Sequence, residues 1–325
     1  MSSESLKKPL NLFFFKELLR TPNSELRTNG YSLRTPNSEL RTYGLRRRDF
    51  VRWLLGFFVL PIFPFHVRKT ETQRISPPPG PKRSIAEFFD GEELEYQIGF
   101  GLFKRVAVGR INFRALSKTG PYLATIEAET VGILGWVARY RVDTYHSKME
   151  EIDGGKRLRS LSFEEDVKIG NKMRRKMSLF DYERRTWIKV RQSKDGTMQR
   201  TEENIPPGLV YDDFLTASYN FRYGAYGEIE RGKKYSVQTF PKKGTSTYEV
   251  IVAGKEEEEK RRKSDKIKQG KEYFIKLILD PEVTHSKEGI IEGWLSKELY
   301  PLEGVIKDVF LFGDVRGVLI KNSRG

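Results

Sequence analysis

The chain has 325 residues and is basic, with 59 Lys and Arg against 44 Asp and Glu and a net charge of +15. Its 38% hydrophobic and 12% aromatic residues are enough for a sizeable core, which excludes full disorder. It has no cysteine and only 3 histidines, which excludes disulfides, thiolate metal sites and cysteine nucleophiles. We therefore expect no metal and no other cofactor.

The excess positive charge is concentrated near the N-terminus. Residues 1–89 hold 16 of the basic and 7 of the acidic residues, a net of +9, and the remaining +6 is spread over the rest of the chain. Such a mixture of signs is typical of an ordinary solvated surface. The charge therefore does not favour a nucleic-acid partner, and nucleic-acid binding is kept only as an alternative function.

Residues 1–45 are predicted to be a disordered, low-complexity leader. The segment RTPNSELRT occurs twice, at 20–28 and at 34–42, a period of 14 residues. Two copies of a polar, proline-containing segment have no apolar face to bury and do not form a solenoid.

Residues 46–68 have the pattern of an export signal or a membrane anchor. An arginine-rich cluster precedes the uncharged apolar run 53–65, as the basic and apolar regions of a signal peptide do. Arg47, Arg48 and Phe50 also fit the twin-arginine pattern. The run is shorter than the roughly 20 residues of a membrane-spanning helix, and no small-residue cleavage site follows it. A cleaved signal and an uncleaved membrane-associated segment both stay open, against the alternative of a buried core helix, and we expect a protein of the periplasm or cell envelope.

Residues 69–84 are predicted to be a linker, because the sequence PPPGP at 77–81 favours an extended polyproline conformation and cannot join a helix. A domain tethered to a membrane needs such a spacer.

Residues 85–325 are predicted to form a single large β-domain. Polar and apolar residues alternate with period two at 92–100 and at 122–128, and turn signals such as Asp153-Gly154 recur every 8–12 residues. That spacing favours antiparallel meanders over alternating strands and helices. Further strands are expected at 105–115, 137–147, 156–165, 173–181, 185–192, 234–240, 246–253, 271–279, 289–296, 303–311 and 314–320.

One segment, 211–223, has helical periodicity within this β pattern. Its apolar residues recur at roughly helical spacing, Asp212 or Asp213 is a suitable N-cap, and Gly224 is a suitable C-cap. A single helix in a large sheet usually covers one open end of it. The predicted fold class is therefore all-β, a mainly antiparallel curled sheet or half-barrel, with one amphipathic helix near 211–223.

Several short motifs along residues 90–325 resemble the bacterial envelope family called domain of unknown function 3108. They are Gly91-Glu92-x-Leu94-x-Tyr96, Tyr140-x-Val142-Asp143-Thr144-Tyr145, Phe180-Asp181-Tyr182, Asp213-Phe214-Leu215-Thr216-x-x-Tyr219-x-x-Arg222, Gly232-Lys233-x-Tyr235, Gly293-Trp294-Leu295-Ser296, Tyr300-Pro301-Leu302 and Gly317-x-Leu319. The order and coverage of these motifs carry the resemblance. It implies an exported, largely antiparallel β-domain and no established activity.

No catalytic motif stands out in the β-domain. His146 lies beside Ser147 on a predicted strand, where neighbouring side chains point to opposite faces, so we interpret it as an ordinary strand histidine. The stretch from Gly227 to Lys233 fits GxxxxGK, but it leads from a helix into a strand, and a phosphate-binding loop does the reverse. Glu127, Glu129, Glu150 and Glu151 are candidate carboxylates for glycosidic chemistry. Glu127 and Glu129 share one strand face, where we expect a solvated or lumen-facing row of charges.

Two basic clusters are candidates for anionic ligands. Residues 172–176 place cations along a predicted strand, and residues 260–263 follow four glutamates that neutralise them, either on a short helix or across a hairpin tip. Both are interpreted as solvated surface.

The leading hypothesis is a non-enzymatic envelope protein whose curled sheet binds a lipid-like or apolar ligand, or an envelope protein partner. Trp136, Trp187 and Trp294 are candidate wall residues of the concave face, although aromatic residues are more often part of a core. The alternatives are a carbohydrate-active hydrolase with clustered carboxylates in the concavity and a nucleic-acid-binding module.

Overall fold

The computed structural model describes residues 83–192, 196–242, 245–265, 270–279, 281–284, 286–309 and 313–324. The predicted leader 1–45, the segment 46–68 with Arg47, Arg48 and Phe50, and most of the linker 69–84 lie outside the described residues. Within the described part, the strands form one 14-stranded sheet in which each neighbouring pair is antiparallel. The predicted fold class is therefore confirmed.

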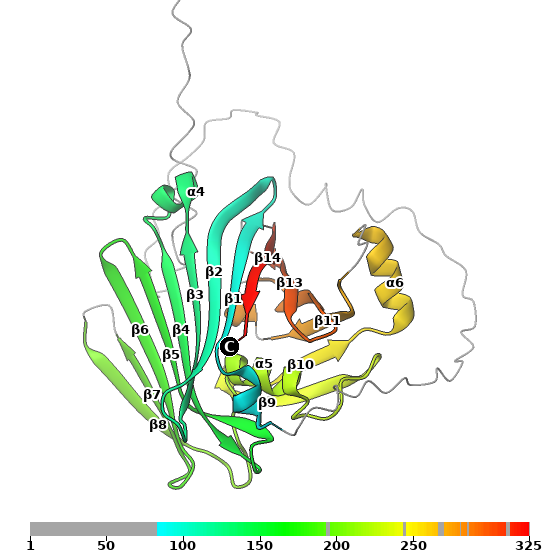
Figure 1. The fold of residues 1–325 in the computed structure, drawn as a ribbon. Coiled ribbons are helices and arrows are strands. Elements are labelled where there is room, and N and C mark those ends of the chain that lie inside the picture. The colour runs from blue at the N-terminus through cyan, green and yellow to red at the C-terminus, as the bar shows by residue number, and fades with distance from the viewer. Residues whose placement is uncertain are drawn as a thin grey trace, which may run out of the picture. The chain divides into compact units, whose positions relative to one another are not determined.

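The first half of the sheet is a run of successive hairpins (Figure 1). Its strands are β1 (Glu92–Phe100), β2 (Phe103–Ala115), β3 (Tyr122–Thr130), β4 (Val142–Ile152), β5 (Arg157–Ile169), β6 (Lys172–Asp181), β7 (Thr186–Gln192) and β8 (Met198–Asn204). In β1, Glu93 is exposed and Leu94 is buried, as the alternation of a strand with one face on the core requires. Gly101 and Gly170 have positive φ angles and make the tight turns after β1 and β5.

The second half of the sheet begins at the opposite edge and returns to the middle. Its strands are β9 (Lys234–Lys242), β10 (Thr245–Val252), β11 (Tyr273–Ile278), β12 (Ile290–Leu295), β13 (Pro301–Val309) and β14 (Gly313–Ser323). Because β14 pairs with β1, the order across the sheet is β8-β7-β6-β5-β4-β3-β2-β1-β14-β13-β12-β11-β10-β9. The sheet is not closed into a barrel, and β8 and β9 are its two edges.

The two halves of the sheet curl toward each other and share aromatic side chains at one end. Phe240 of β9 packs on Phe180 of β6 and Trp187 of β7, with ring centroids 5.4 and 5.3 Å apart. The connection from β8 to β9 also follows this seam, where the backbone N–H of Asp212 donates to the carbonyl of Gln238 at 3.0 Å. The concave face is therefore covered at this end by the chain itself.

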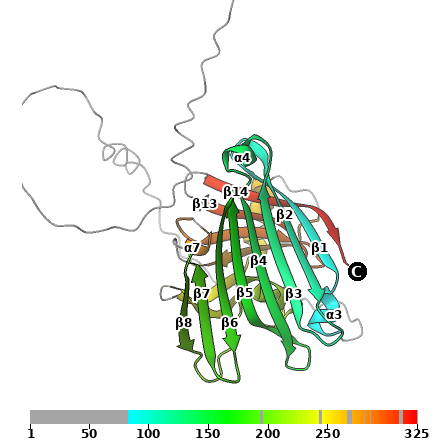
Figure 2. The same ribbon diagram turned by 90° about the vertical axis from the view of Figure 1, so that its left-hand side faces the viewer.

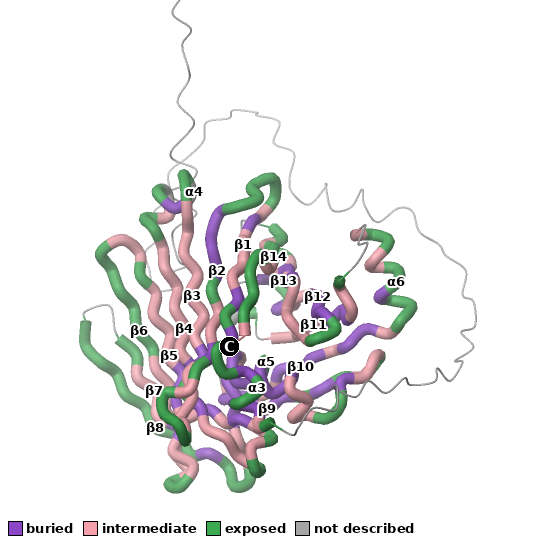
Figure 3. The backbone as a smooth tube through the Cα atoms, in the orientation of Figure 1, coloured by how far each residue is buried: buried purple, intermediate pink, exposed green. Residues whose placement is uncertain are grey.

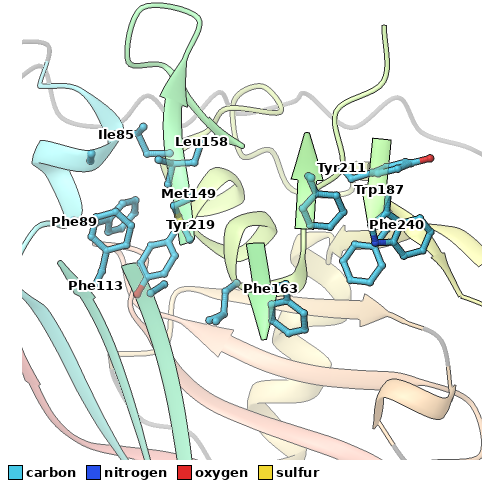
Figure 4. Close-up of a cluster of buried hydrophobic side chains, with 14 of the residues drawn as sticks. Ile85, Phe89, Phe113, Met149, Leu158, Phe163, Trp187, Tyr211, Tyr219 and Phe240 are labelled. Atoms are coloured by element: carbon cyan, nitrogen blue, oxygen red, sulfur yellow. The ribbon is translucent and has the colours of Figure 1, made fainter. Parts of the chain in front are cut away.

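The helix predicted near 211–223 is α5 (Phe214–Tyr223), and it lies on the concave side of the sheet (Figure 1). Asp213 is its N-cap, and Gly224, in the left-handed conformation, is its C-cap. Leu215 and Tyr219 of α5 pack with α3 (Ile85–Phe89) and with strands from the first half of the sheet, and Ala217 and Phe221 pack with strands from the second half. Figure 4 shows Tyr219 beside Phe89 and Phe113, with Tyr211, Trp187 and Phe240 grouped at the other end.

Four further helices occur in the described part of the chain, in addition to the predicted one. They are α3, α4 (Gly132–Val137), α6 (Lys255–Ser264) and α7 (Pro281–Thr284). The strand expected at 137–147 begins only at Val142, since α4 ends at Val137 and a turn follows it. Of the two arrangements left open for the charged stretch, the structure has the helix. α6 lies over Trp294 on the convex face, with Arg261 2.5 Å from Glu292 and Arg262 5.1 Å from the Trp294 ring.

Burial follows this arrangement. Figure 3 shows the buried residues gathered around α5 and the lower ends of the strands, while much of β3 to β5 above is intermediate and the upper part of β6 is exposed. Ile126 of β3 and Ile291 of β12 both belong to the concave face and are only partly buried. The helix thus fills one end of the concave face and leaves an apolar surface above it.

A candidate apolar cavity framed by helix α5

A buried cluster of hydroxyl groups fixes the start of α5. The carboxylate of Asp213 accepts hydrogen bonds from the backbone N–H of Leu215 and Thr216, and from the hydroxyls of Ser147, Ser160 and Thr216 at 2.5, 2.7 and 2.9 Å. Ser147 and Ser160 lie on β4 and β5. The cap therefore holds the helix to the middle of the first half of the sheet.

The preceding residue, Asp212, joins three more parts of the fold. Its Oδ2 lies 2.9 Å from Arg157 of β5 and 2.6 Å from the hydroxyl of Tyr226, and the amide nitrogen of Asn220 is 3.4 Å away. The Asp212 side chain is fully buried. Burial raises the pKa of Asp212 to about 6, although the charge of Arg157 and the bond from Tyr226 act in the opposite direction.

The end of α5 is held by a buried ion pair. Arg222 donates two hydrogen bonds of 2.7 Å to the carboxylate of Glu92 on β1 and a third, of 2.8 Å, to the carbonyl of Leu299. Arg324 adds a bond of 2.8 Å to the same carboxylate. Burial raises the pKa of Glu92, but the bonds and charges of Arg222 and Arg324 outweigh this effect and leave the pKa below its usual value.

An apolar cavity of about 200 Å³ lies between α5 and the concave face of the sheet. Its walls come from strands on both sides of the β1–β14 junction and from one face of the helix. The lining is mainly aliphatic and aromatic and includes Leu94, Ile111, Ile126, Phe214, Leu277 and Ile291. Except for Phe214 of α5, these residues occupy inward positions of their strands, as the pairing of Leu94 with Ile111 and of Leu277 with Ile291 shows.

Few polar groups reach this cavity. The Tyr219 hydroxyl is buried and has no hydrogen-bond partner among the described residues, and burial raises the pKa of Tyr219. Ser218 also lines the cavity and is exposed although it lies in the middle of α5, so this side of the helix faces an opening. The cavity therefore connects with the open part of the concave face.

The part of the concave face that is formed by β5 to β8 carries charged side chains. Lys176 of β6 lies 3.0 Å from Glu165 of β5, and Lys189 of β7 lies 2.5 Å from Glu203 of β8. Glu165 is two residues from the buried Phe163, and Lys189 is two residues from the buried Trp187, so both pairs share the inward face with those aromatics. The concave face thus combines an apolar half with a half that carries ion pairs.

The carboxylates considered for glycosidic chemistry do not meet in this cavity. Glu127 pairs with the exposed Arg110 at 3.2 Å, and Glu129 lies on the same face of β3, two residues further on. Glu150 binds Arg159 at 2.6 Å, and Glu151 accepts a hydrogen bond from the backbone N–H of Ala86 at the start of α3. They are distributed over the convex face and the lower rim.

His146 and Ser147 point to opposite faces of β4, as neighbours on a strand do. Ser147 is buried and bonds to Asp213, whereas the Nδ1 atom of His146 lies 3.1 Å from the hydroxyl of Thr125. Lys233, from the GxxxxGK stretch, lies between α5 and β9 and pairs with Glu230 at 3.0 Å.

None of the three tryptophans singled out from the sequence lines the cavity. Trp136 on α4 is 63% exposed. Trp187 is buried in the aromatic cluster at the seam, and Trp294 is buried on the convex face with Phe274. The aliphatic residues of the period-two strands form most of the wall, and sequence reasoning missed them because the same pattern also describes a filled core.

Some cations of the two basic clusters form ion pairs. In the first, Arg175 bonds to Asp166 at 2.7 and 2.9 Å and Lys176 to Glu165. In the second, Arg261 pairs with Glu292 and Asp265.

Among the described residues, no three His, Asp or Glu side chains are placed to hold a metal ion together. No helix within the described ranges is long and apolar enough to cross a membrane.

These features define a class of protein, an open antiparallel sheet curled around one helix with an apolar cavity between them. The family model described as "Protein of unknown function (DUF3108)" matches residues 95–319, and the chain belongs to this family. The motif residues Asp213, Thr216 and Arg222, which contributed to the resemblance seen in the sequence, are among the residues whose side chains hold α5 on the sheet.

Among solved structures, the chain is similar to the crystal structure of a β-barrel-like protein of domain of unknown function DUF1849 from Brucella abortus. The two share 10% identity and a TM-score of 0.38, and the match covers 73% of this chain and 98% of that chain. No curated protein gives a significant match to the sequence.

Proposed function

We propose that this chain is a non-enzymatic protein of the cell envelope that holds a lipid-like, apolar ligand in the cavity above α5. The observation that carries the proposal is the lining, in which aliphatic side chains from strands far apart in the sequence surround a space beside one face of α5. Concave sites with mainly apolar walls and few polar groups are the usual form of small-molecule sites.

The size of the cavity suits part of a lipid. Its volume of about 200 Å³ exceeds the roughly 150 Å³ of an apolar cavity that takes up benzene. A ring or a short acyl segment fits within it, and the rest of a longer ligand extends through the opening beside Ser218. Polar parts of an amphiphile then meet the half of the concave face that carries Lys176 and Lys189.

The envelope location rests on the sequence before the β-domain. Arg47, Arg48 and Phe50 followed by the apolar run 53–65 are typical of an exported or membrane-associated chain. A reporter enzyme fused after residue 85 is expected to be located in the periplasm. Replacing Arg47 and Arg48 by lysine is expected to reduce this export, and a cytoplasmic reporter would contradict the proposed location.

Ligand binding is tested by titrating the detergent-free chain with the fluorescent apolar probe N-phenyl-1-naphthylamine. Ser218→Trp places a large side chain at the opening of the cavity without altering the buried side of α5, and it is expected to weaken probe binding at least about tenfold. The matched control Ser218→Ala is expected to bind like the parent chain. Equal probe binding by all three proteins would overturn the assignment of the cavity as the site.

A further inference from the structure

Strand β8 is an edge of the sheet that the described chain leaves uncovered. It pairs with β7 on one side, and Figure 2 shows no labelled element beside it on the other. All of Met198–Asn204 is exposed. The opposite edge, β9, differs because Asp212 donates to its Gln238 carbonyl and Pro241 has no N–H to offer. An exposed strand edge is a template for pairing with another strand.

The register with β7 shows which backbone groups of β8 point away from the sheet. The N–H of Ile205 donates to the carbonyl of Arg185 at 2.7 Å, and the pairing continues with Glu203 opposite Trp187 and Thr201 opposite Lys189. In an antiparallel pair, hydrogen-bonded and non-bonded positions alternate. The odd-numbered residues therefore bond to β7, and the backbone groups of Arg200 and Glu202 point outward.

We propose that β8 pairs antiparallel with β8 of a second copy of this chain, about a two-fold axis at Thr201. In that register, the outward backbone groups of Arg200 meet those of Glu202 in the second copy, and the reverse pair forms on the other side of the axis. Their side chains share one face of the strand and already form an ion pair of 3.3 Å within one chain, so the pairing exchanges this ion pair in each copy for two cross-strand ion pairs. Two-fold self-pairing of one surface is the common form of a homodimer.

Charge selects this register over its neighbours. Because only even-numbered residues have outward backbone groups, the adjacent allowed registers are centred on Arg200 or on Glu202. Those registers would place two arginines or two glutamates directly opposite each other, which is unfavourable. Only the register centred on Thr201 places opposite charges together on both sides of the axis. The complementarity lies within one short segment, so the occupant it specifies is another copy of the same segment.

The register makes a cross-linking prediction, because the native chain has no cysteine. Thr201 would form a non-hydrogen-bonded pair with its own copy, at a Cα separation of about 4.5 Å, which a disulfide can span. Oxidised Thr201→Cys chains are therefore expected to form covalent dimers. In the control Gln199→Cys, on the same face of β8, the two cysteines would be four residues out of register, roughly 14 Å apart, and no disulfide dimer is expected.

Charge reversal tests the pairing without a covalent bond. Sedimentation of the purified full chain over a range of concentrations is expected to show a reversible dimer. Arg200→Glu and Glu202→Arg are each expected to weaken it about tenfold, and the double variant Arg200→Glu/Glu202→Arg to restore it. Thermal unfolding of each variant checks that the monomer is intact. A monomer at all concentrations, association unaffected by either single reversal, or equal cross-linking of both cysteine variants would overturn the proposal.

Discussion

Replacing Arg222 with methionine tests whether the end of α5 is held by its buried ion pair. The Arg222 and Glu92 side chains are 4% and 0% exposed, so the substitution leaves a carboxylate in a site that water barely reaches. Breaking a buried pair by removing one partner usually costs about 3–5 kcal/mol. Arg324 still lies 2.8 Å from Glu92, which places the loss near the lower end, and the lost bond to Leu299 adds about 1 kcal/mol.

We therefore expect Arg222→Met to lower the free energy of unfolding by about 4 kcal/mol, measured by urea unfolding with tryptophan fluorescence as the signal. The control is the double variant Glu92→Gln/Arg222→Met, which removes both charges and is expected to lose clearly less than the sum of the two single losses. A loss below about 1 kcal/mol for Arg222→Met, or strictly additive losses in the double variant, would refute this account of the pair.

Three further substitutions test the surroundings of the helix. Asp213→Ala removes an N-cap and leaves buried hydroxyls without their acceptor, so a loss of about 3 kcal/mol is expected in urea unfolding, and a loss under 1 kcal/mol would contradict the cluster. The pKa of Asp212 is about 6 in the folded chain against 3.8 as its ordinary value, so its protonated form favours folding. Its contribution to stability falls by about 2 kcal/mol as the pH rises from 4 to 6, and by about 3 kcal/mol over the whole range from below pH 3 to above pH 7. Asp212→Asn is expected to lack this pH dependence. Parallel curves of unfolding free energy against pH for the two proteins would disprove the raised pKa of Asp212. Gly289→Ala is expected to lower the melting temperature by several degrees, because Gly289 has φ +71° and an added Cβ would meet the Leu279 carbonyl; an unchanged melting temperature would count against this packing.

The sheet was largely predictable from the sequence because its strands alternate with period two between glycine turns. β8 was not predicted, since its sequence MQRTEEN is polar on both faces and shows no alternation of polar and apolar residues. The caps of α5 were also predictable, because Asp213 and Gly224 have the residue types that helix ends require. For the charged stretch 255–270, the sequence did not distinguish a helix from a hairpin tip, since opposite charges suit both.

The cavity was not predictable to the same degree. Alternation identifies the inward residues of each strand, but it does not show which strands face each other across the fold or whether the space between them is filled. The pairing of β14 with β1 brings Leu94 and Ile291 to one wall, and no local pattern encodes that contact. Trp294 shows the same limit, because it is buried beneath α6 on the convex face and not on the concave one.

The central claim, that the space above α5 takes up an apolar ligand, is tested most directly by native mass spectrometry of the full chain purified without detergent and incubated with decanoic acid. We expect one bound molecule per chain in the parent protein and in Ser218→Ala, and a strong reduction in Ser218→Trp. If the parent chain carries no ligand at decanoic acid concentrations near saturation, or Ser218→Trp retains it fully, the cavity is not the site that we propose.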